Sequence, residues 1–265
     1  MNIAIATSLF AENGFDEFLT INFAEENKIS AIQFYMNTNL QNNKTKITEI
    51  RNSCLKKQIK ILCHSPKMLG EASNDITHCE ALTSFFYESS PKYCIFHFDE
   101  NCEIETMISD CEKLISLGII PCIENFYINK TSDSLNANIK KFLAFFDIIS
   151  EKNLPVLPVL DFPRLFIEQF ANLNPISLTK SLIQKFSNKK IIIHAIDSTS
   201  PKQERSDWCA VGRGIVKWNE IFDLIKKYEI SAEFVVLEYE NTDFVDESVE
   251  YIKKRSRNLP RSFIK

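Results

Sequence analysis

Eight short apolar runs recur along the chain and alternate with longer segments in which apolar residues have helical spacing. The runs are Asn2–Thr7, Ala31–Tyr35, Ile59–His64, Tyr93–Phe98, Ile119–Asn125, Val156–Asp161, Lys190–Ala195 and Phe234–Tyr239. A short apolar run bounded by Pro or charged residues is typical of a strand buried on both faces of a parallel sheet. The sequence therefore predicts eight parallel strands.

The segments between the runs have the length and pattern of amphipathic helices. They are Gly14–Glu26, Lys44–Lys57, Ile76–Ser89, Ile104–Leu117, Ser134–Lys152, Pro175–Phe186 and Val216–Tyr228, with Phe244–Arg255 after the last run. Helix N-cap chemistry is available at Asn13, Asp75, Ser132 and Asn174. Strands that alternate with helices indicate right-handed βαβ units, and eight such units close into a (β/α)8 TIM barrel.

The length of the chain favours one barrel over other α/β arrangements. It has 265 residues, and such barrels typically have about 250. No stretch rich in Pro, Gly or Ser divides it, so we expect a single α/β domain over residues 1–265. An open doubly wound sheet is the alternative, but the chain lacks the G-x-G-x-x-G turn of a dinucleotide-binding sheet and has only five glycines.

Charge and composition narrow the class of partner. The formal net charge is −4, which argues against nucleic acid because non-specific binding relies on Lys and Arg. The start of the chain has neither the basic segment nor the long apolar stretch of a signal peptide, and no run reaches the roughly 18 to 20 apolar residues of a membrane span. We therefore expect a cytoplasmic protein with no membrane partner.

The eight cysteines lack C-x-x-C spacing, which indicates buried free thiols.

Four successive runs end on side chains that bind metal ions. Glu124 lies at the C-terminal end of the fifth run, and Asp161, His194 and Glu238 lie at the ends of the next three, each at the last or the last but one position. The C-terminal ends of barrel strands form the active site, so these side chains are expected to meet at one mouth. Burying three carboxylates together is costly unless a cation is present. This set suits one divalent Mn²⁺, Mg²⁺, Co²⁺ or Zn²⁺ ion with open positions for substrate oxygens.

With His64 and His97 ending the third and fourth runs, the pattern resembles the xylose isomerase-like barrel superfamily. A second segment, Asp207-Trp-Cys-Ala-Val-Gly-Arg-Gly-Ile-Val-Lys-Trp-Asn-Glu-Ile221, is similar to the superfamily's loop of form G-x-G-x-[IV]-x-[WF]-x-x-[IV] before the last barrel helix. The superfamily includes sugar and sugar-phosphate isomerases and epimerases, inosose dehydratases, hydroxypyruvate isomerases and endonuclease IV-type abasic-site nucleases.

The resemblance implies a role for each of these residues. The ligands of one divalent metal ion would be Glu124, Asp161, His194 and Glu238. Glu124 and Glu238 would also flank the substrate and move its proton. His64 and His97 would line the same mouth and bind the substrate, and in the nucleases the matching residues bind further zinc ions.

The chain also departs from the superfamily pattern. Asp161-Phe-Pro-Arg164 stands where Asp-x-x-His is common, and Ser206-Asp207-Trp208 stands where the nucleases have Asp-x-His. Both differences remove ligands of the second and third zinc ions, which disfavours a nuclease. Lys130 replaces an additional substrate-binding Glu of the epimerases, which disfavours an ordinary ketohexose epimerase.

Three further residues are predicted to act at the mouth. Arg164 and Lys67 are cationic groups on loops after strands, and Asn125 is expected to hydrogen-bond and orient a ligand. Arg suits bidentate recognition of phosphate or carboxylate. If Arg164 binds the substrate, an anionic sugar or polyol derivative is implied.

The leading hypothesis is a divalent-metal-dependent isomerase or epimerase of a small sugar, sugar phosphate or sugar acid, acting by proton transfer next to a carbonyl. A metal-dependent dehydratase (lyase) of a cyclic polyol on the same site is the nearest alternative. An endonuclease IV-like phosphodiesterase and a barrel without catalytic activity are the others. Barrels of this kind often form dimers or tetramers, so a homo-oligomer is left open, and no stretch identifies an interface.

Overall fold

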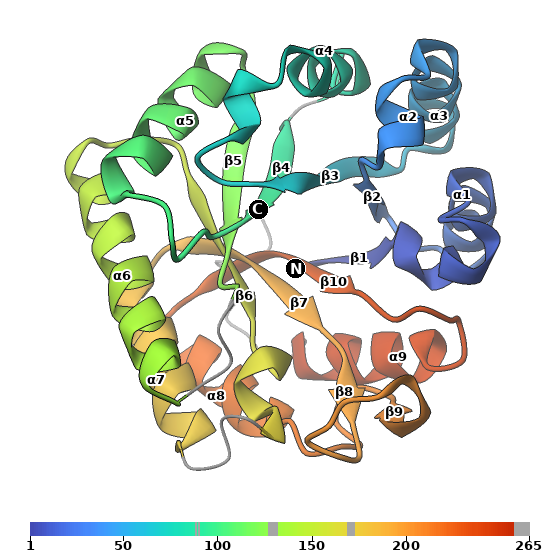
Figure 1. Ribbon diagram of the computed structural model, residues 1–265. Coiled ribbons are helices and arrows are strands. Elements are labelled where there is room, and N and C mark those ends of the chain that lie inside the picture. The colour runs from blue at the N-terminus through green and yellow to red at the C-terminus, as the bar shows by residue number, and fades with distance from the viewer. Residues whose placement is uncertain (88, 90, 127–131, 169–172, 257–265) are drawn as a thin grey trace.

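The computed structural model describes residues 1–87, 89, 91–126, 132–168 and 173–256. Lys130, one of the positions considered above, lies outside these ranges. Within them the chain forms a closed barrel of parallel strands with helices around it, as Figure 1 shows. This confirms the predicted (β/α)8 barrel. The prediction that residues 1–265 form a single domain stays a prediction.

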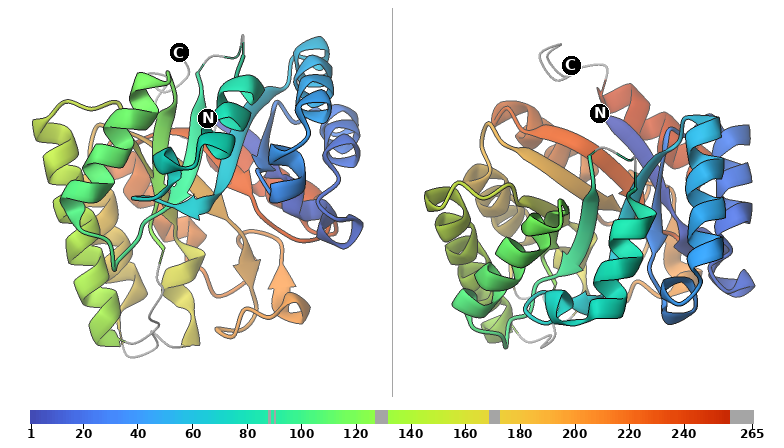
Figure 2. Two further views of the ribbon diagram at one scale, coloured as in Figure 1. Left: turned by 45° about the horizontal axis from the view of Figure 1, so that its top comes forward. Right: turned by 90° about the horizontal axis from the view of Figure 1, so that it is seen from above.

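The barrel strands follow one another in chain order around the ring. They are β1 Asn2–Ala6, β2 Ala31–Tyr35, β3 Lys60–Met68, β4 Tyr93–His97, β5 Ile120–Glu124, β6 Leu157–Asp161, β7 Lys190–Ala195 and β10 Ser231–Leu237. The ring closes where β1 pairs in parallel with β10. Two short strands, β8 Asp197–Ser198 and β9 Trp208–Cys209, form a separate antiparallel pair. This pair lies at the end of the barrel opposite the N-terminus (Figure 2).

Helices cover the outside of the ring. They are α1 Glu17–Glu26, α2 Thr38–Gln41, α3 Lys44–Lys57, α4 Ile76–Phe85, α5 Ile104–Ser116, α6 Ser132–Glu151, α7 Pro175–Lys185, α8 Trp218–Lys227 and α9 Val245–Ser256. Short 3-10 turns add η1 Thr7–Asn13, η2 Ala72–Asn74, η3 Pro163–Phe166 and η5 Arg205–Asp207. Each predicted helix has a counterpart, whereas α2 and the 3-10 turns were not predicted. Asp75 and Asn174 cap α4 and α7 as expected.

The start of α1 differs from the prediction. Asn13 ends η1, and the next two residues, Gly14 and Phe15, are left-handed with φ of 71° and 62°. A helix cannot continue through such residues. The side chain of Asp16 instead accepts hydrogen bonds from Phe18 N and Leu19 N and caps α1. The irregular turn that results carries Phe15 to the barrel mouth.

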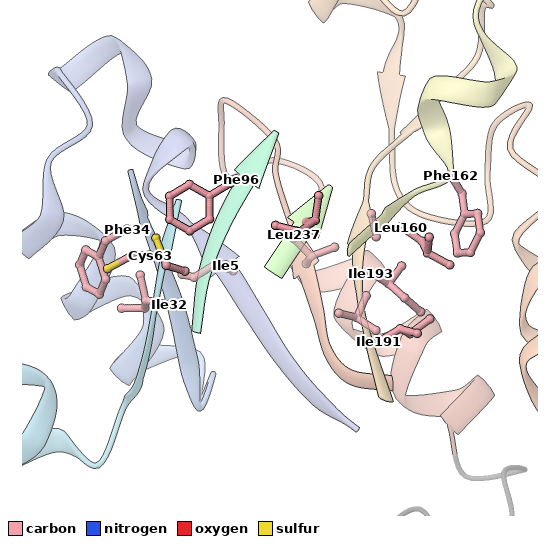
Figure 3. Close-up of a cluster of buried hydrophobic side chains, with 14 of the residues drawn as sticks. Ile5, Ile32, Phe34, Cys63, Phe96, Leu160, Phe162, Ile191, Ile193 and Leu237 are labelled. Carbon is pink, nitrogen blue, oxygen red and sulfur yellow. The ribbon is translucent and has the colours of Figure 1, made fainter. Parts of the chain in front are cut away.

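Two apolar layers hold the barrel together. The outer layer lies between strands and helices and includes Ile5, Phe34, Ile193 and Leu237 (Figure 3). The inner layer consists of Ala4, Ala6, Ala31, Leu62, Tyr93, Ile95, Cys122, Val159, Ile192, Phe234 and Val236. Because side chains alternate between the two faces of a strand, these two sets occupy opposite faces. The interior is therefore a packed core, as expected for a barrel of eight strands.

The cysteines are free, as predicted, but Cys79, Cys102 and Cys209 are only partly buried. All eight are free, and five of them are buried. Burial raises the pKa of the Cys63 and Cys94 thiols well above the ordinary range, so these side chains act as small apolar groups. In the described part of the chain, no helix combines the length and apolar character needed to cross a membrane.

Candidate active site

The strand period explains why polar side chains meet at the mouth. Leu62, Ile95, Cys122, Val159, Ile192 and Val236 all face the barrel interior. The residues two positions further along the same strands are His64, His97, Glu124, Asp161, His194 and Glu238. With a period of two, these side chains also point inward. They form the last interior layer at the C-terminal ends of the strands, which is where the sequence predicted them to converge.

Glu124 is at the centre of this layer and is fully buried. Its Oε2 atom lies 3.2 Å from His64 Nε2, 3.5 Å from His97 Nε2 and 3.3 Å from His194 Nδ1. Burial alone would raise the pKa of Glu124, but His194, His97 and Arg164 hold it well below the ordinary range. Glu124 is therefore a carboxylate at neutral pH.

Arg164 occupies the other side of Glu124. Its Nε atom is 3.2 Å from Glu124 Oε1 and 2.5 Å from Asp161 Oδ2. The guanidinium lies over the ring of Phe126, 4.7 Å from its centroid, and that ring stacks on His97 at 4.1 Å. Burial raises the pKa of Asp161 to about 6 in spite of the guanidinium beside it. Arg164 is thus held by two carboxylates and an aromatic face.

His194 links Glu124 to Glu238. Its Nδ1 is 3.0 Å from Glu238 Oε2, and its Nε2 is 3.0 Å from Gln33 Oε1. The Gln33 carboxamide also donates from Nε2 to Glu238 Oε1 at 2.5 Å. Burial would lower the pKa of His194, but Glu238 and Glu124 raise it well above its ordinary value. Gln33 therefore orients both the imidazole and the carboxylate.

Sequence reasoning missed Gln33. The signal was a single polar residue in the middle of the apolar run Ala31–Tyr35. A buried carboxamide in such a run needs partners, and Gln33 has an exposed fraction of 2%.

His97 differs from the other imidazoles in its surroundings. Burial lowers its pKa to about 4, against the opposing effect of Glu124. The ring is consequently neutral at pH 7. His64 Nδ1 lies 3.0 Å from the carbonyl oxygen of Ser65, which positions its Nε2 toward Glu124.

Asn125 lies next to the cluster, whereas Lys67 pairs with the residue that caps α4. Asn125 is buried behind the mouth, where its Nδ2 donates to Asp161 O at 3.2 Å and its Oδ1 accepts from Asp161 N at 2.7 Å. It fixes β6 against β5 and so positions Asp161; its role in orienting a ligand stays a prediction. Lys67 pairs with Asp75 at 3.2 Å.

The residues at the mouth fit a metal ion. Among the described residues, His64, His97 and Glu124 form one group of ligand atoms within 4.8 Å of one another, and Glu124, Asp161 and His194 form another. Metal–ligand bonds of about 2.0 to 2.2 Å set neighbouring ligand atoms about 3.0 to 3.5 Å apart. The separations around Glu124 Oε2, 3.2 to 3.5 Å, lie in this range.

His194 gives a second sign of this fit. Its buried Nδ1 makes no hydrogen bond of good geometry with any described residue, although two carboxylate oxygens lie 3.0 and 3.3 Å away. A cation between these atoms would satisfy them. Glu238, the fourth predicted ligand, belongs to neither group of three and contacts the cluster through His194.

Two cavities open beside the cluster, and Glu238 borders both. One of about 270 Å³ is lined by Phe15, Gln33, Tyr35, His64 and His97 among others. The other, of about 170 Å³, is lined by Asp161, Arg164, His194 and Gln203 among others. The exposed fraction of the Glu238 side chain is 23%, whereas that of Glu124 is 0%.

Phe15 and Tyr35 form an aromatic wall that sequence reasoning did not foresee. Their ring centroids are 5.5 Å apart, and both line the larger cavity. Phe15 has φ of 62°, which is unusual for a bulky residue.

The loop that resembles the G-x-G motif is anchored by a buried carboxylate. Asp197 accepts hydrogen bonds from the backbone N–H groups of Gly212 and Gly214 at 2.9 and 3.1 Å, and from those of Ser198 and Val216 at 2.9 and 3.2 Å. A Cβ atom on Gly214 would lie 2.2 Å from Ser198 O. The motif therefore keeps this loop close to β8.

Comparison with known proteins gives relatives by structure alone. No family model matches the sequence, and no curated protein matches it. The xylose isomerase domain protein of Planctomyces limnophilus superposes with a TM-score of 0.67 at 10% identity, covering 98% of each chain. The chain has the fold of the xylose isomerase-like barrels.

Two further structures superpose over almost the whole chain. A probable 3-DHS dehydratase, AsbF from Bacillus anthracis, gives a TM-score of 0.65 at 16% identity, covering 96% of this chain and 99% of AsbF. The zinc-bound IolI protein gives 0.64 at 13% identity, covering 99% of each chain. D-psicose 3-epimerases and an endonuclease IV also match, with TM-scores of 0.57 to 0.59. The fold is thus shared by proteins named for several different reactions.

Proposed function

We propose that the chain is a divalent-metal-dependent isomerase or epimerase of a small sugar-like substrate. The observation that carries the proposal is the convergence of three imidazoles on Glu124 Oε2. Beside them, the carboxylate of Glu238 borders a cavity. The zinc named for IolI supports a metal of this kind.

A bound divalent ion would polarise neighbouring carbonyl and hydroxyl oxygens of a substrate and acidify the C–H between them. Glu124 is the ligand common to both groups of metal-binding side chains. It is fully buried and in contact with His64, His97, His194 and Arg164. We therefore assign Glu124 a role in metal binding in preference to a role in proton transfer. The other predicted ligands, Asp161, His194 and Glu238, surround it.

Glu238 is the best placed base. It borders both cavities, and its charged form is favoured because His194 keeps the pKa of Glu238 below the ordinary value against the effect of burial. Gln33 donates to Glu238 Oε1 and His194 lies against Glu238 Oε2, so the Glu238 carboxylate has a fixed orientation. A proton taken from one carbon can be returned by the same group to the neighbouring carbon, as in aldose–ketose isomerisation.

The larger cavity supports a sugar-like substrate. Its volume of about 270 Å³ suits a small molecule. Gln33 and Glu238 line it with polar atoms, and a divalent ion at its His64 and His97 edge would take substrate oxygens. Phe15 and Tyr35 offer aromatic faces to the C–H side of a sugar. The D-psicose 3-epimerases among the structural matches are named for sugar substrates.

Deuterium exchange tests this function. Sugars, sugar phosphates and sugar acids would be incubated with Zn²⁺- or Co²⁺-loaded protein in D₂O and followed by NMR. We expect one substrate to gain carbon-bound deuterium and to convert into an isomer. Glu238→Gln should reduce the rate by at least about 10²-fold, in keeping with loss of a general base. Glu233→Gln, at the far end of the same strand in contact with Lys190, is the matched control and should keep the rate.

Product analysis separates the alternatives. A dehydratase would release water and give an absorbing unsaturated product without forming an isomer. Cleavage of an abasic-site duplex at a rate typical of repair enzymes would favour the phosphodiesterase instead. A barrel without catalytic activity would exchange no substrate in the panel and bind no divalent ion.

A further inference from the structure

Two candidate cation positions share Glu124. One is bounded by His64, His97 and Glu124, and the other by Glu124, Asp161 and His194. They differ in what already lies beside them. At the second position Arg164 Nε is 2.5 Å from Asp161 Oδ2 and 3.2 Å from Glu124 Oε1. At the first, Glu124 Oε2 faces imidazole nitrogens.

We propose that the guanidinium of Arg164 is a built-in cation that fills the second position, so that the protein holds a single divalent ion on the imidazole side of Glu124. The inference rests on the proposed function, since it assumes a metal-binding mouth. Beyond the proposed function, the inference specifies how many ions bind and on which side of Glu124 they bind. It also names Arg164 as the residue that determines both.

The guanidinium is suited to this role because its charge and place are permanent. Arg stays protonated at all accessible pH values, and the carboxylates of Asp161 and Glu124 lie against its Nε atom. The face of Phe126 supports the group at 4.7 Å, and Phe126 in turn stacks on His97. A divalent ion entering beside Asp161 would meet this fixed positive charge at contact distance and be repelled.

Among the described residues, no Arg or Lys side chain lies against Glu124 Oε2, which faces only imidazole nitrogens. The Nε2 atoms of His64 and His97 point at Glu124 Oε2, and the carbonyl of Ser65 accepts from the opposite nitrogen of His64. Two imidazoles and one carboxylate prefer Zn²⁺ or Co²⁺ to Mg²⁺, which prefers oxygen ligands. Of the metals predicted from the sequence, Zn²⁺ and Co²⁺ are therefore favoured.

Metal counting on the wild-type chain and two variants tests the inference. Equilibrium dialysis against Co²⁺, with metal analysis and absorption spectra of the bound ion, would give the number of ions per chain. We expect one ion for wild type and one for Arg164→Lys, which keeps the positive charge. Arg164→His replaces that charge by a neutral ligand and should bind two.

Ligand variants locate the ion. His97→Ala should weaken Co²⁺ binding by at least about 10-fold and change the spectrum, as expected for loss of a ligand. Asp161→Asn should retain the ion with the same spectrum. Circular dichroism and melting temperature would establish that each variant is folded.

The outcomes separate the two proposals. No ion bound to the wild-type chain at saturating Co²⁺ would remove the metal-dependent function and the inference together. Two ions on wild type, or one on folded Arg164→His, would overturn the inference and leave the function standing. Loss of the ion in Asp161→Asn with retention in His97→Ala would also overturn it.

Discussion

Glu124 and Asn125 are neighbours on β5 with different tasks. Glu124 faces the barrel interior, whereas the Asn125 carboxamide exchanges hydrogen bonds with both backbone groups of Asp161. Asn125 therefore controls where Asp161 lies. The sequence predicted a role for both residues. Because side chains alternate along a strand, only one of the two can point inward, but the alternation alone does not tell which. The structure decides it by showing which residues of β5 face the barrel interior.

Asn125→Ala should destabilise the protein. It leaves the N–H and C=O groups of Asp161 without the carboxamide that satisfies them in the interior, which costs about 1 to 3 kcal/mol per unsatisfied group. Urea denaturation would measure the change in the free energy of unfolding. Asn42→Ala is the control, because Asn42 is exposed and bonds only locally, to Thr38 O, and should shift stability by no more than about 0.5 kcal/mol. Equal effects of the two substitutions would contradict this role.

His78 makes stability depend on pH. It is fully buried and its Nε2 is 3.0 Å from Ser65 Oγ. Burial lowers its pKa from 6.5 to about 4. The folded protein therefore binds fewer protons than the unfolded chain between these values. Its contribution to stability is present above pH 6.5 and is lost as the pH falls toward 4.

His78→Gln removes this contribution. From pH 7 to pH 5 the free energy of unfolding of the wild-type protein should fall by about 2 kcal/mol more than that of the variant, because one pKa unit corresponds to about 1.4 kcal/mol. Urea denaturation at both pH values measures the difference. Parallel pH profiles for the two proteins would show that His78 is not held neutral by burial.

At the scale of elements, regular strands and helices were predictable and their connections were not. The apolar runs marked the barrel strands because each is buried on both faces. β3 extends to Met68, beyond the predicted end at His64, since an irregularity in register lets Met68 pair with His97. Polar residues and Pro66 in this extension conceal it from any apolar pattern. The left-handed pair Gly14 and Phe15 was hidden for a similar reason, because bulky residues rarely adopt that conformation.

The loop between β8 and α8 depends on the absence of a side chain at Gly214. A Cβ there would lie 2.2 Å from Ser198 O and 2.3 Å from Asp197 Oδ1. Gly214→Ala should force the loop away from Asp197 and cost about 1 to 3 kcal/mol, as overpacking does. Urea denaturation and limited proteolysis of residues 197–216 would detect both effects.

Gly14→Ala is the control variant for Gly214→Ala. Gly14 has φ of 71° and no heavy atom within 4 Å of its Cβ position, so the substitution adds only backbone strain of about 1 kcal/mol. Its proteolysis pattern in residues 197–216 should match that of wild type. A Gly214→Ala protein that resists protease like the wild type would contradict the steric argument.

At the scale of the whole molecule, eight repeats of strand and helix determine both the fold and the place of the site. Because every barrel strand is parallel to its neighbours, the C-terminal ends of these strands share one mouth. A period of two along each strand carries side chains from six of them into one layer. These rules made the convergence of Glu124, Asp161, His194 and Glu238 predictable. They do not determine distances, so the pairing of Arg164 with Asp161 and Glu124 became visible only in three dimensions.

Zinc-edge anomalous diffraction from crystals soaked in Zn²⁺ tests the metal centre most directly. We predict one peak per chain, bordered by His64 Nε2, His97 Nε2 and Glu124 Oε2, with Arg164 still paired to Asp161. A mouth without any peak at saturating Zn²⁺ would contradict the account.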